Sequence, residues 1–184
     1  MNYATIKKFD IANGPGVRVS LFVSGCRHHC KNCFNKEAWD FNYGNPMTVE
    51  IEEEILDACK AGHITGLSLL GGEPFEKENR AGLISLTKKF RQRYPDKNIW
   101  CYTGFLLDEE LLKSDDSDIK ELLQNIDVLV DGRFVEELKS ASLLFRGSSN
   151  QRIIEVAETL KKGEVVLLPG KWERTMGSGD IYEA

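Results

Sequence analysis

The chain has 184 residues and a formal net charge of −5; 41% of its residues are hydrophobic and 29% are charged. This length and composition predict one soluble globular domain and exclude a disordered or fibrous chain. The acidic balance offers no extended basic face for a nucleic-acid backbone, so we expect no nucleic acid among its partners. No apolar run is long enough to cross a bilayer, and the N-terminus lacks the apolar segment of a signal peptide. We therefore expect a cytoplasmic protein without a membrane partner.

Strand and helix patterns alternate along most of the chain. Residues 17–24 are apolar and β-branched, which is typical of a buried strand. Similar patterns predict strands at 64–70, 98–103 and 126–130, and helices at 48–59, 77–94 and, for the most part, 108–124. Residues 151–168 fit either two strands or a helix and a strand.

This alternation predicts an α/β fold of right-handed βαβ units, in which functional residues gather at the carboxyl ends of the strands. We expect a partial (β/α) barrel of about five to six mainly parallel strands. The core domain is expected to span residues 1–152. Residues 153–184 are expected to form a C-terminal extension that packs partly on the core and has a flexible end.

Three of the five cysteines, Cys26, Cys30 and Cys33, lie in the stretch VSGCRHHCKNCFN after the strand predicted at 17–24. In a reducing compartment such clustering indicates metal binding or catalysis, because structural disulfides are disfavoured there. The spacing C-x3-C-x2-C supplies three thiolates, which suits a [4Fe-4S] cluster whose fourth iron stays open to a substrate or cofactor. A zinc site completed elsewhere, for example by His28 or His29, and three unrelated buried thiols are the alternatives.

The motif CRHHCKNCF resembles that of the radical S-adenosylmethionine (SAM) enzymes, in which an aromatic residue follows the third cysteine. The resemblance implies a barrel of the radical SAM type with a [4Fe-4S] cluster on Cys26, Cys30 and Cys33, which would be both the metal ligands and the catalytic residues. It further implies that SAM chelates the unique iron and that Phe34 lies near the adenine. The other two cysteines, Cys59 and Cys101, are expected to be core thiols.

The stretch LSLLGGEPF ends a predicted strand with Gly71, Gly72, Glu73 and Pro74. Glycines without side chains let a ligand approach the backbone, and free carbonyls after the last strand bond can accept from an ammonium group. A similar segment of radical SAM enzymes holds the methionine amino group, so the resemblance implies cofactor contacts at these four residues. A plain strand-to-helix turn is the alternative.

Two further strand ends carry polar residues. WCYTG ends with Thr103 and Gly104, and VLVDGRF places Asp131 and Arg133 after a short apolar strand. A carboxylate can accept from ribose hydroxyls and a guanidinium can pair with a carboxylate, so the resemblance implies SAM contacts at Thr103, Asp131 and Arg133. Lysine is usual where Arg133 stands, and a surface turn is the alternative for Asp131 and Arg133.

The segments DIANGPGVR and FRGSSNQR resemble parts of glycyl-radical enzyme activases, the second those of anaerobic ribonucleotide reductase in particular. The resemblance implies reductive cleavage of SAM and generation of a glycyl radical on the large subunit of the anaerobic ribonucleoside-triphosphate reductase. A reduced electron carrier such as flavodoxin would be a second partner. Arg18 is expected to pair with a carboxylate near the site, and the charged or titratable Arg27, His28, His29 and Lys31 either attract an acidic partner or are simply solvated.

Three alternatives remain open at this point. The chain could activate another glycyl-radical enzyme of the pyruvate formate-lyase type. It could act on a small molecule, like the radical SAM enzyme 7-carboxy-7-deazaguanine synthase. It could also be a zinc-stabilised binding module without catalysis.

Overall fold

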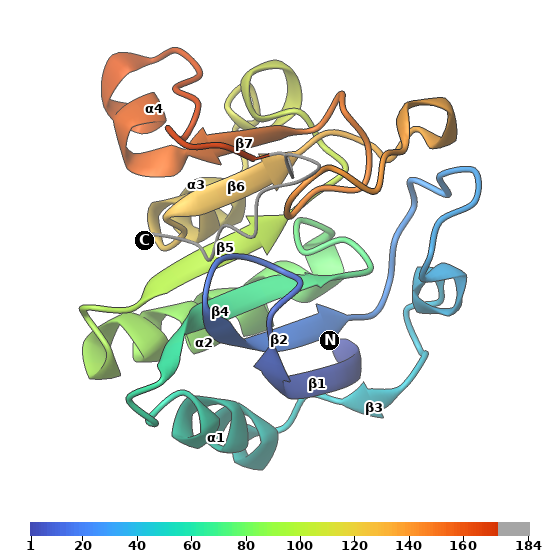
Figure 1. The fold of residues 1–184 in the computed structure, drawn as a ribbon. Helices are drawn as coiled ribbons and strands as arrows, with labels where there is room; N and C mark the ends of the chain where they lie inside the picture. The colour runs from blue at the N-terminus through green and yellow to red at the C-terminus, as the bar shows by residue number, and fades with distance from the viewer. Residues whose placement is uncertain (173–184) are drawn as a thin grey trace.

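The structure is a computed structural model that describes residues 1–172. Its centre is one open sheet of seven strands in the order β3-β1-β2-β4-β5-β6-β7, as Figure 1 shows. The strands are β1 (Asn2–Asp10), β2 (Val17–Val23), β3 (Asn45–Pro46), β4 (Ile64–Gly71), β5 (Asn98–Tyr102), β6 (Val128–Asp131) and β7 (Arg152–Glu155). The α-helices are α1 (Val49–Ala58), α2 (Lys77–Arg93), α3 (Ser117–Gln124) and α4 (Val156–Lys162).

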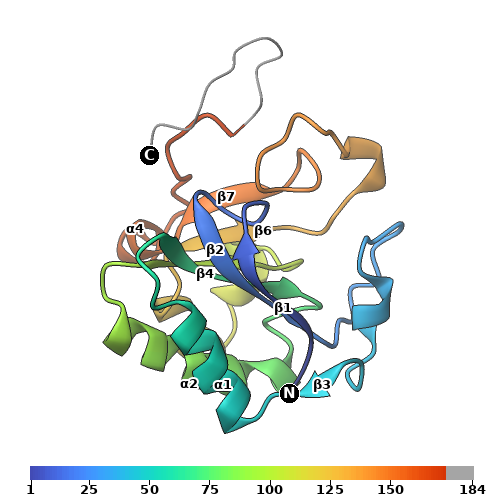
Figure 2. The same cartoon turned by 60° about the horizontal axis from the view of Figure 1, so that its bottom comes forward.

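The four strands β2, β4, β5 and β6 are parallel neighbours, and antiparallel strands flank them on both sides. The helices α1, α2 and α3 connect these parallel strands, and α1 and α2 lie together on one side of the sheet (Figure 2). Because the four strands are parallel, their carboxyl ends meet at one edge of the sheet. The segments that follow β2, β4, β5 and β6 are therefore brought together.

Apolar side chains cover both faces of the sheet. The larger core lies between the sheet and the helices and includes Leu69 and Ile99 from the strands and Leu83 and Phe90 from α2. A smaller cluster is built around Trp100, Val128, Val130 and Ile153, with Phe145, Leu168 and Trp172 packed against it. Burial on both faces explains why the central strands are continuous apolar runs in the sequence.

Arg18 of β2 is fully buried, and the sequence-based expectation for it is wrong. Its guanidinium donates hydrogen bonds to Ser68 Oγ (2.7 Å) and to the carbonyl of Leu67 (2.8 Å), and it lies over the Trp100 ring. Within residues 1–172 it forms no ion pair with a carboxylate. Arg18 therefore links β2 to β4 and is a structural residue.

The prediction of an α/β fold with a parallel centre is confirmed, but the predicted number of strands was wrong. The sheet has seven strands instead of five or six, because β1 and the two-residue β3 were missed. The edge strand β3 pairs with β1 only at Asn2 and Tyr3, so Lys7 and Lys8 farther along β1 are exposed, and exposed lysines are one way in which natural proteins protect an unpaired strand. The sheet is open, and its assignment to the radical SAM barrel type stays a prediction.

The helix expected over 108–124 is divided. The first part is a π-helical turn at Leu107–Leu111, and the second part is α3. Helix α3 has its own N-cap, Asp116, whose side chain accepts from the amide of Asp118 (3.0 Å). Of the alternatives for 151–168, the structure shows a strand and then a helix.

The predicted domain boundary falls at the first residue of β7. After α4 the chain returns along this strand, since the amide of Leu168 donates to the carbonyl of Ile153 (2.9 Å). The division at residue 152 stays a prediction, and most of the flexible end expected for the C-terminal extension lies outside the described residues. No helix among residues 1–172 is long and apolar enough to cross a bilayer.

Candidate functional site

The three clustered cysteines lie in a curled loop that follows β2. Positive φ angles of 50° at His29 and 56° at Asn32 turn the backbone back on itself. The amide of Cys33 donates to the carbonyl of Cys30 (3.1 Å), and the amide of Cys26 donates to the carbonyl of Trp39 (3.2 Å). The loop is thus held by its own backbone and by the short helical turn that follows it.

Cys26, Cys30 and Cys33 all line one cavity of about 460 Å³. Its other walls come from Gly71–Glu73 after β4 and Tyr102–Gly104 after β5, together with parts of the loop before β2 and the segment before β7. Cavities of this size hold small-molecule ligands and cofactors in other proteins. The cysteines and two of the other predicted strand ends therefore share one site.

The cysteines have the chemistry of a cluster site. All three are free thiols, and burial raises the pKa of Cys26 to about 11 and also raises the pKa of Cys30. Metal ligation requires thiolates, so a bound metal centre would have to displace these protons. No three His, Cys, Asp or Glu side chains within residues 1–172 surround a point where one metal ion could bind. A cubane cluster does not need such a point, because each thiolate binds a different iron, and the donor set fits it.

Two residues that line the cavity each carry a buried polar atom without a partner among the described residues. Trp39 and Tyr102 both line the cavity, and neither the indole N–H of Trp39 nor the hydroxyl of Tyr102 has a hydrogen-bond partner among the described residues. Buried polar groups are normally paired.

Glu73 is the centre of a hydrogen-bond network behind the cavity. Its carboxylate is 1% exposed; Oε1 accepts from the amide of Phe75 (2.9 Å) and from Thr103 Oγ1 (2.8 Å). Oε2 accepts from the amide of Gly104 (2.8 Å) and lies 2.9 Å from His28 Nε2. One carboxylate therefore joins the cysteine loop to the turns after β4 and β5.

The two glycines before Glu73 are required by the protein itself. A Cβ on Gly71 would lie 2.7 Å from the backbone of Phe22, and one on Gly72 would lie 2.5 Å from the carbonyl oxygen of Gly25. The amide of Gly72 also donates to the carbonyl of Val23 (2.7 Å). The space without side chains admits the end of β2 and the start of the cysteine loop. Both glycines also line the cavity, so the predicted contact with a ligand stays a prediction.

The other predicted cofactor contacts divide into two groups. Phe34, which is 82% exposed, and Thr103, which is 5% exposed, line the cavity. Pro74 is buried behind it, and Arg133 is exposed; neither lines the cavity.

Asp131 has a different environment from the one the sequence suggested. Its carboxylate is 0% exposed and accepts from Arg152 Nε (2.9 Å) and from the amide of Leu107 (2.9 Å). Arg152 also pairs with Asp108 (2.8 Å). Asp131 does not line the cavity, so its predicted contact with a bound nucleotide stays a prediction, and the structure gives it a structural partner.

The sequence pattern gave no structural reason for the FRGSSNQR segment. In the structure, residues 145–152 include a loop held by hydrogen bonds of its own polar side chains. Gln151 Oε1 accepts from the amides of Gly147 (2.7 Å) and Ser148 (3.1 Å), and Gln151 Nε2 donates to the carbonyl of Gly132 (2.9 Å). These bonds tie the exit of β6 to the entry of β7. The segment thereby forms a wall of the cavity.

Several cavity residues were missed by the sequence analysis: Ile11–Asn13, Tyr102, Phe134, Lys139 and Gln151. Gln151 lies in a segment that the resemblance had selected, and Tyr102 directly precedes Thr103. Lys139 lies in a stretch without a regular pattern, so no local signal could have found it.

The charged residues of the cysteine loop are largely paired. Arg27 forms ion pairs with Glu76 and with Glu78 (2.7 Å), and Lys31 lies 3.0 Å from Glu137. His28 is buried. The positive face that was one interpretation of this loop is therefore partly neutralised by neighbouring carboxylates.

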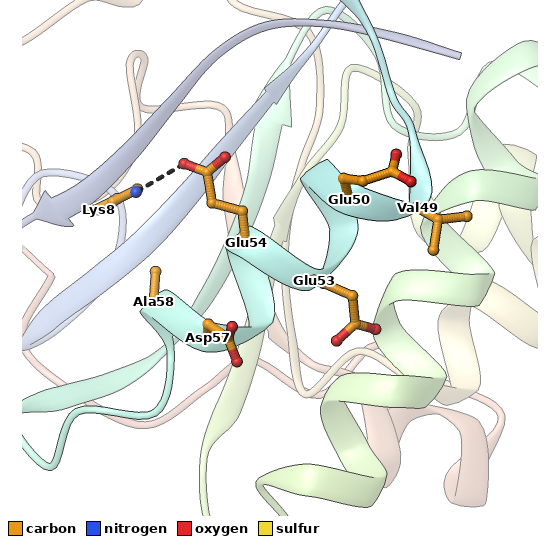
Figure 3. A pocket seen from close by; sticks show the side chains of 7 residues that line it. All are labelled: Lys8, Val49, Glu50, Glu53, Glu54, Asp57 and Ala58. Atoms are coloured by element: carbon orange, nitrogen blue, oxygen red, sulfur yellow. Dashed lines mark ion pairs between the residues drawn. The ribbon is translucent and has the colours of Figure 1, made fainter.

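A second hollow of about 670 Å³ lies beside α1 (Figure 3). Carboxylates of Glu50, Glu53, Glu54 and Asp57 surround it, and Lys8 pairs with Glu54 at 2.8 Å. None of the predicted site residues lines this hollow. The cavity at the strand ends is the candidate site.

Comparisons with known proteins agree with a metal-cluster site. Residues 12–154 match the family described as 4Fe-4S single cluster domain. The chain is 44% identical over 153 residues to the "Anaerobic ribonucleoside-triphosphate reductase-activating protein" of Escherichia coli (strain K12), which covers 82% of this chain and 96% of that protein. A protein of the same name from Vibrio cholerae is 43% identical, and the alignment covers 83% of this chain and 97% of that protein. The protein of this name from Enterobacteria phage T4 is 37% identical, with 83% of this chain and 93% of that protein covered.

Proposed function

Since the chain belongs to the 4Fe-4S single cluster domain family and to the family of anaerobic ribonucleoside-triphosphate reductase-activating proteins, we propose that it is a radical SAM activase. It would bind one [4Fe-4S] cluster and SAM in the cavity and generate a glycyl radical on the large subunit of that reductase. The observation that carries this proposal is that all three cysteines line one cavity with the Glu73 turn.

When bound, the reduced cluster and SAM supply one-electron cleavage to methionine and a 5′-deoxyadenosyl radical, which can take a hydrogen atom from a glycine Cα. The thiolates of Cys26, Cys30 and Cys33 would hold three irons. The turn at Gly71–Glu73 would bind the methionine amino group, and Phe34 would contact the adenine.

The remaining cavity residues would bind the other polar parts of SAM. Thr103 lies at the end of β5 with its hydroxyl bonded to Glu73, so it is rigidly placed. Lys139 lines the cavity, while the predicted Arg133 does not, so we propose Lys139 as a cationic contact for the carboxylate of SAM. Held at both ends, SAM would be oriented for reaction without a search through other positions.

Two partners follow from this function. The glycine to be activated belongs to a macromolecule, and the exposed Phe34 at the cavity shows that this wall is accessible from outside. A reduced electron carrier such as flavodoxin would deliver the electron to the cluster. The radical SAM barrel type and a cytoplasmic location are part of the same proposal.

The test uses protein purified and reconstituted without oxygen. Wild type should contain about four irons and four sulfides per chain and should release methionine and 5′-deoxyadenosine from SAM when reduced. Cys30→Ala should lose both properties. Cys101→Ala is the matched control, because this thiol is fully buried in β5 and belongs to the core on the helical side of the sheet.

The choice of partner is tested by paramagnetic resonance. A glycyl radical signal should form on the anaerobic ribonucleotide reductase and not on a pyruvate formate-lyase. SAM cleavage without a protein radical would favour a small-molecule substrate of the 7-carboxy-7-deazaguanine synthase kind. About one zinc per chain without sulfide would contradict the proposal and favour a binding module.

A further inference from the structure

We propose that His28 is a positioning residue that locks the cysteine loop onto the Glu73 turn and so sets the separation between the two. This inference rests on the proposed function, in which one ligand, SAM, contacts the cluster on the loop and the turn after β4 at the same time. The separation of these two segments then decides how well SAM is bound.

The ring of His28 occupies a slot formed by other segments of the chain. Its side chain is 6% exposed, and Nε2 lies 2.9 Å from Glu73 Oε2. The ring packs edge-on against Phe105 with centroids 4.5 Å apart. A Cβ on Gly104 would lie 2.4 Å from His28 Cδ2, so the absence of a side chain there makes room for the imidazole.

The neighbouring His29 shows that the sequence position alone does not produce this contact. His29 is exposed, has a positive φ of 50°, and stacks on Trp39 with centroids 4.5 Å apart. Both residues lie between Cys26 and Cys30. Only His28 reaches the network behind the cavity, which makes His29 a matched control.

Removal of the His28 ring should leave the fold intact. Glu73 would keep three donors, the amides of Phe75 and Gly104 and the hydroxyl of Thr103, so its buried carboxylate would remain hydrogen-bonded. What is lost is the one bond between this carboxylate and the cysteine loop.

The bonds from the Glu73 amide to the carbonyl of Gly25 (2.8 Å) and from the Arg27 amide to Glu76 Oε1 (2.9 Å) remain, so the change is confined to the part of the loop after Arg27. A loss of SAM binding with retained metal content is therefore the signature of a positioning role.

The test compares His28→Ala with His28→Gln, whose amide nitrogen can replace Nε2, and with His29→Asn, because asparagine tolerates a positive φ. Each full-length variant is reconstituted with iron and sulfide, reduced, and titrated with SAM while the paramagnetic resonance spectrum of the cluster is recorded. We expect full iron content in all variants. His28→Ala should need about 10-fold more SAM, and the other two should lie within about 3-fold of wild type.

Two results would overturn the proposal. One is a wild-type SAM titration for His28→Ala. The other is loss of iron from His28→Ala, which would make His28 part of cluster assembly instead of a positioning residue.

A second measurement separates this proposal from the proposed function. If SAM leaves even the wild-type spectrum unchanged, the proposed function fails, but the contact between the loop and the turn can still be tested. The rate of alkylation of Cys30 and Cys33 by iodoacetamide in metal-free full-length chain should rise about 10-fold in His28→Ala and be restored in His28→Gln. Unchanged alkylation rates in His28→Ala would overturn the proposal that His28 holds the cysteine loop against the Glu73 turn.

Discussion

Glu73 and Asp131 are buried carboxylates at the carboxyl ends of two parallel strands, and yet they serve different parts of the molecule. Glu73 accepts from His28, Thr103 and two amides and lies on the wall of the cavity. Asp131 accepts from Arg152 and lies outside that wall. The resemblance to radical SAM enzymes implied a cofactor contact for both.

The difference shows that a strand end alone does not define a site. Neutral donors and a histidine from the cysteine loop surround Glu73, so its network connects elements that line the cavity. A guanidinium from β7 holds Asp131, so its ion pair connects β6 to the edge of the sheet. Substitutions should therefore affect ligand binding at the first carboxylate and stability at the second.

The largest expected effect is that of Asp131→Asn on stability. Loss of this buried charge leaves Arg152 without its main partner, and we expect the free energy of unfolding to fall by about 3 kcal/mol. Urea denaturation measures it, and SAM titration of the folded, reconstituted variant should match that of wild type. If SAM binding fell while stability did not, Asp131 would face the ligand and the comparison would fail.

Glu73→Gln should reduce SAM binding by about 10-fold and stability by about 2 kcal/mol. In either orientation the new NH2 group faces a backbone N–H, that of Phe75 or that of Gly104, and two donors cannot pair. The SAM titration described for His28 measures the first effect and urea denaturation the second. If Glu73→Gln lowered stability but left SAM binding unchanged, Glu73 would be a structural residue like Asp131, and the comparison would fail.

Gly104→Ala should cost about 1.5 kcal/mol of stability, because the added methyl group overlaps the His28 ring. It should also weaken SAM binding in the same direction as His28→Ala. Gly62→Ala is the control for a general effect of alanine, because no heavy atom lies within 4 Å of a Cβ at that position. Equal behaviour of the two variants would show that the His28 slot is not tight.

The smallest effect concerns the outer partner of Arg152. The Arg152 guanidinium donates to Asp108 and lowers the pKa of that carboxyl below its ordinary value of 3.8. The ion pair therefore stabilises the fold fully at a pH above 3.8. This contribution to stability is lost as the pH falls through the lowered pKa. Asp108→Asn should cost at most about 1 kcal/mol at pH 7, because the pair is partly exposed. The difference from wild type, followed by thermal denaturation against pH, should shrink below about pH 4 and not above it.

Much of the fold and part of the site could be predicted from local sequence. The strands β2, β4, β5 and β6 are short apolar runs, and α1 and α2 have helical spacing, so their identity depends on residues close together in the chain. Cys26, Cys30 and Cys33 were predicted to share a site because a single loop carries them. Strand β1 was missed because it is mostly half-buried or exposed and carries charged residues, so it has no such apolar run.

The sequence by itself determined the parallel centre of the sheet, the gathering of strand ends at one edge, and the thiol chemistry placed there. Only the tertiary structure decided which side chains at that edge meet. His28 reaches Glu73 across 45 residues, and Arg152 reaches Asp131 across 21. Such contacts depend on strand order and on the direction of each side chain, and no local periodicity records them, because periodicity describes one element and not its neighbours.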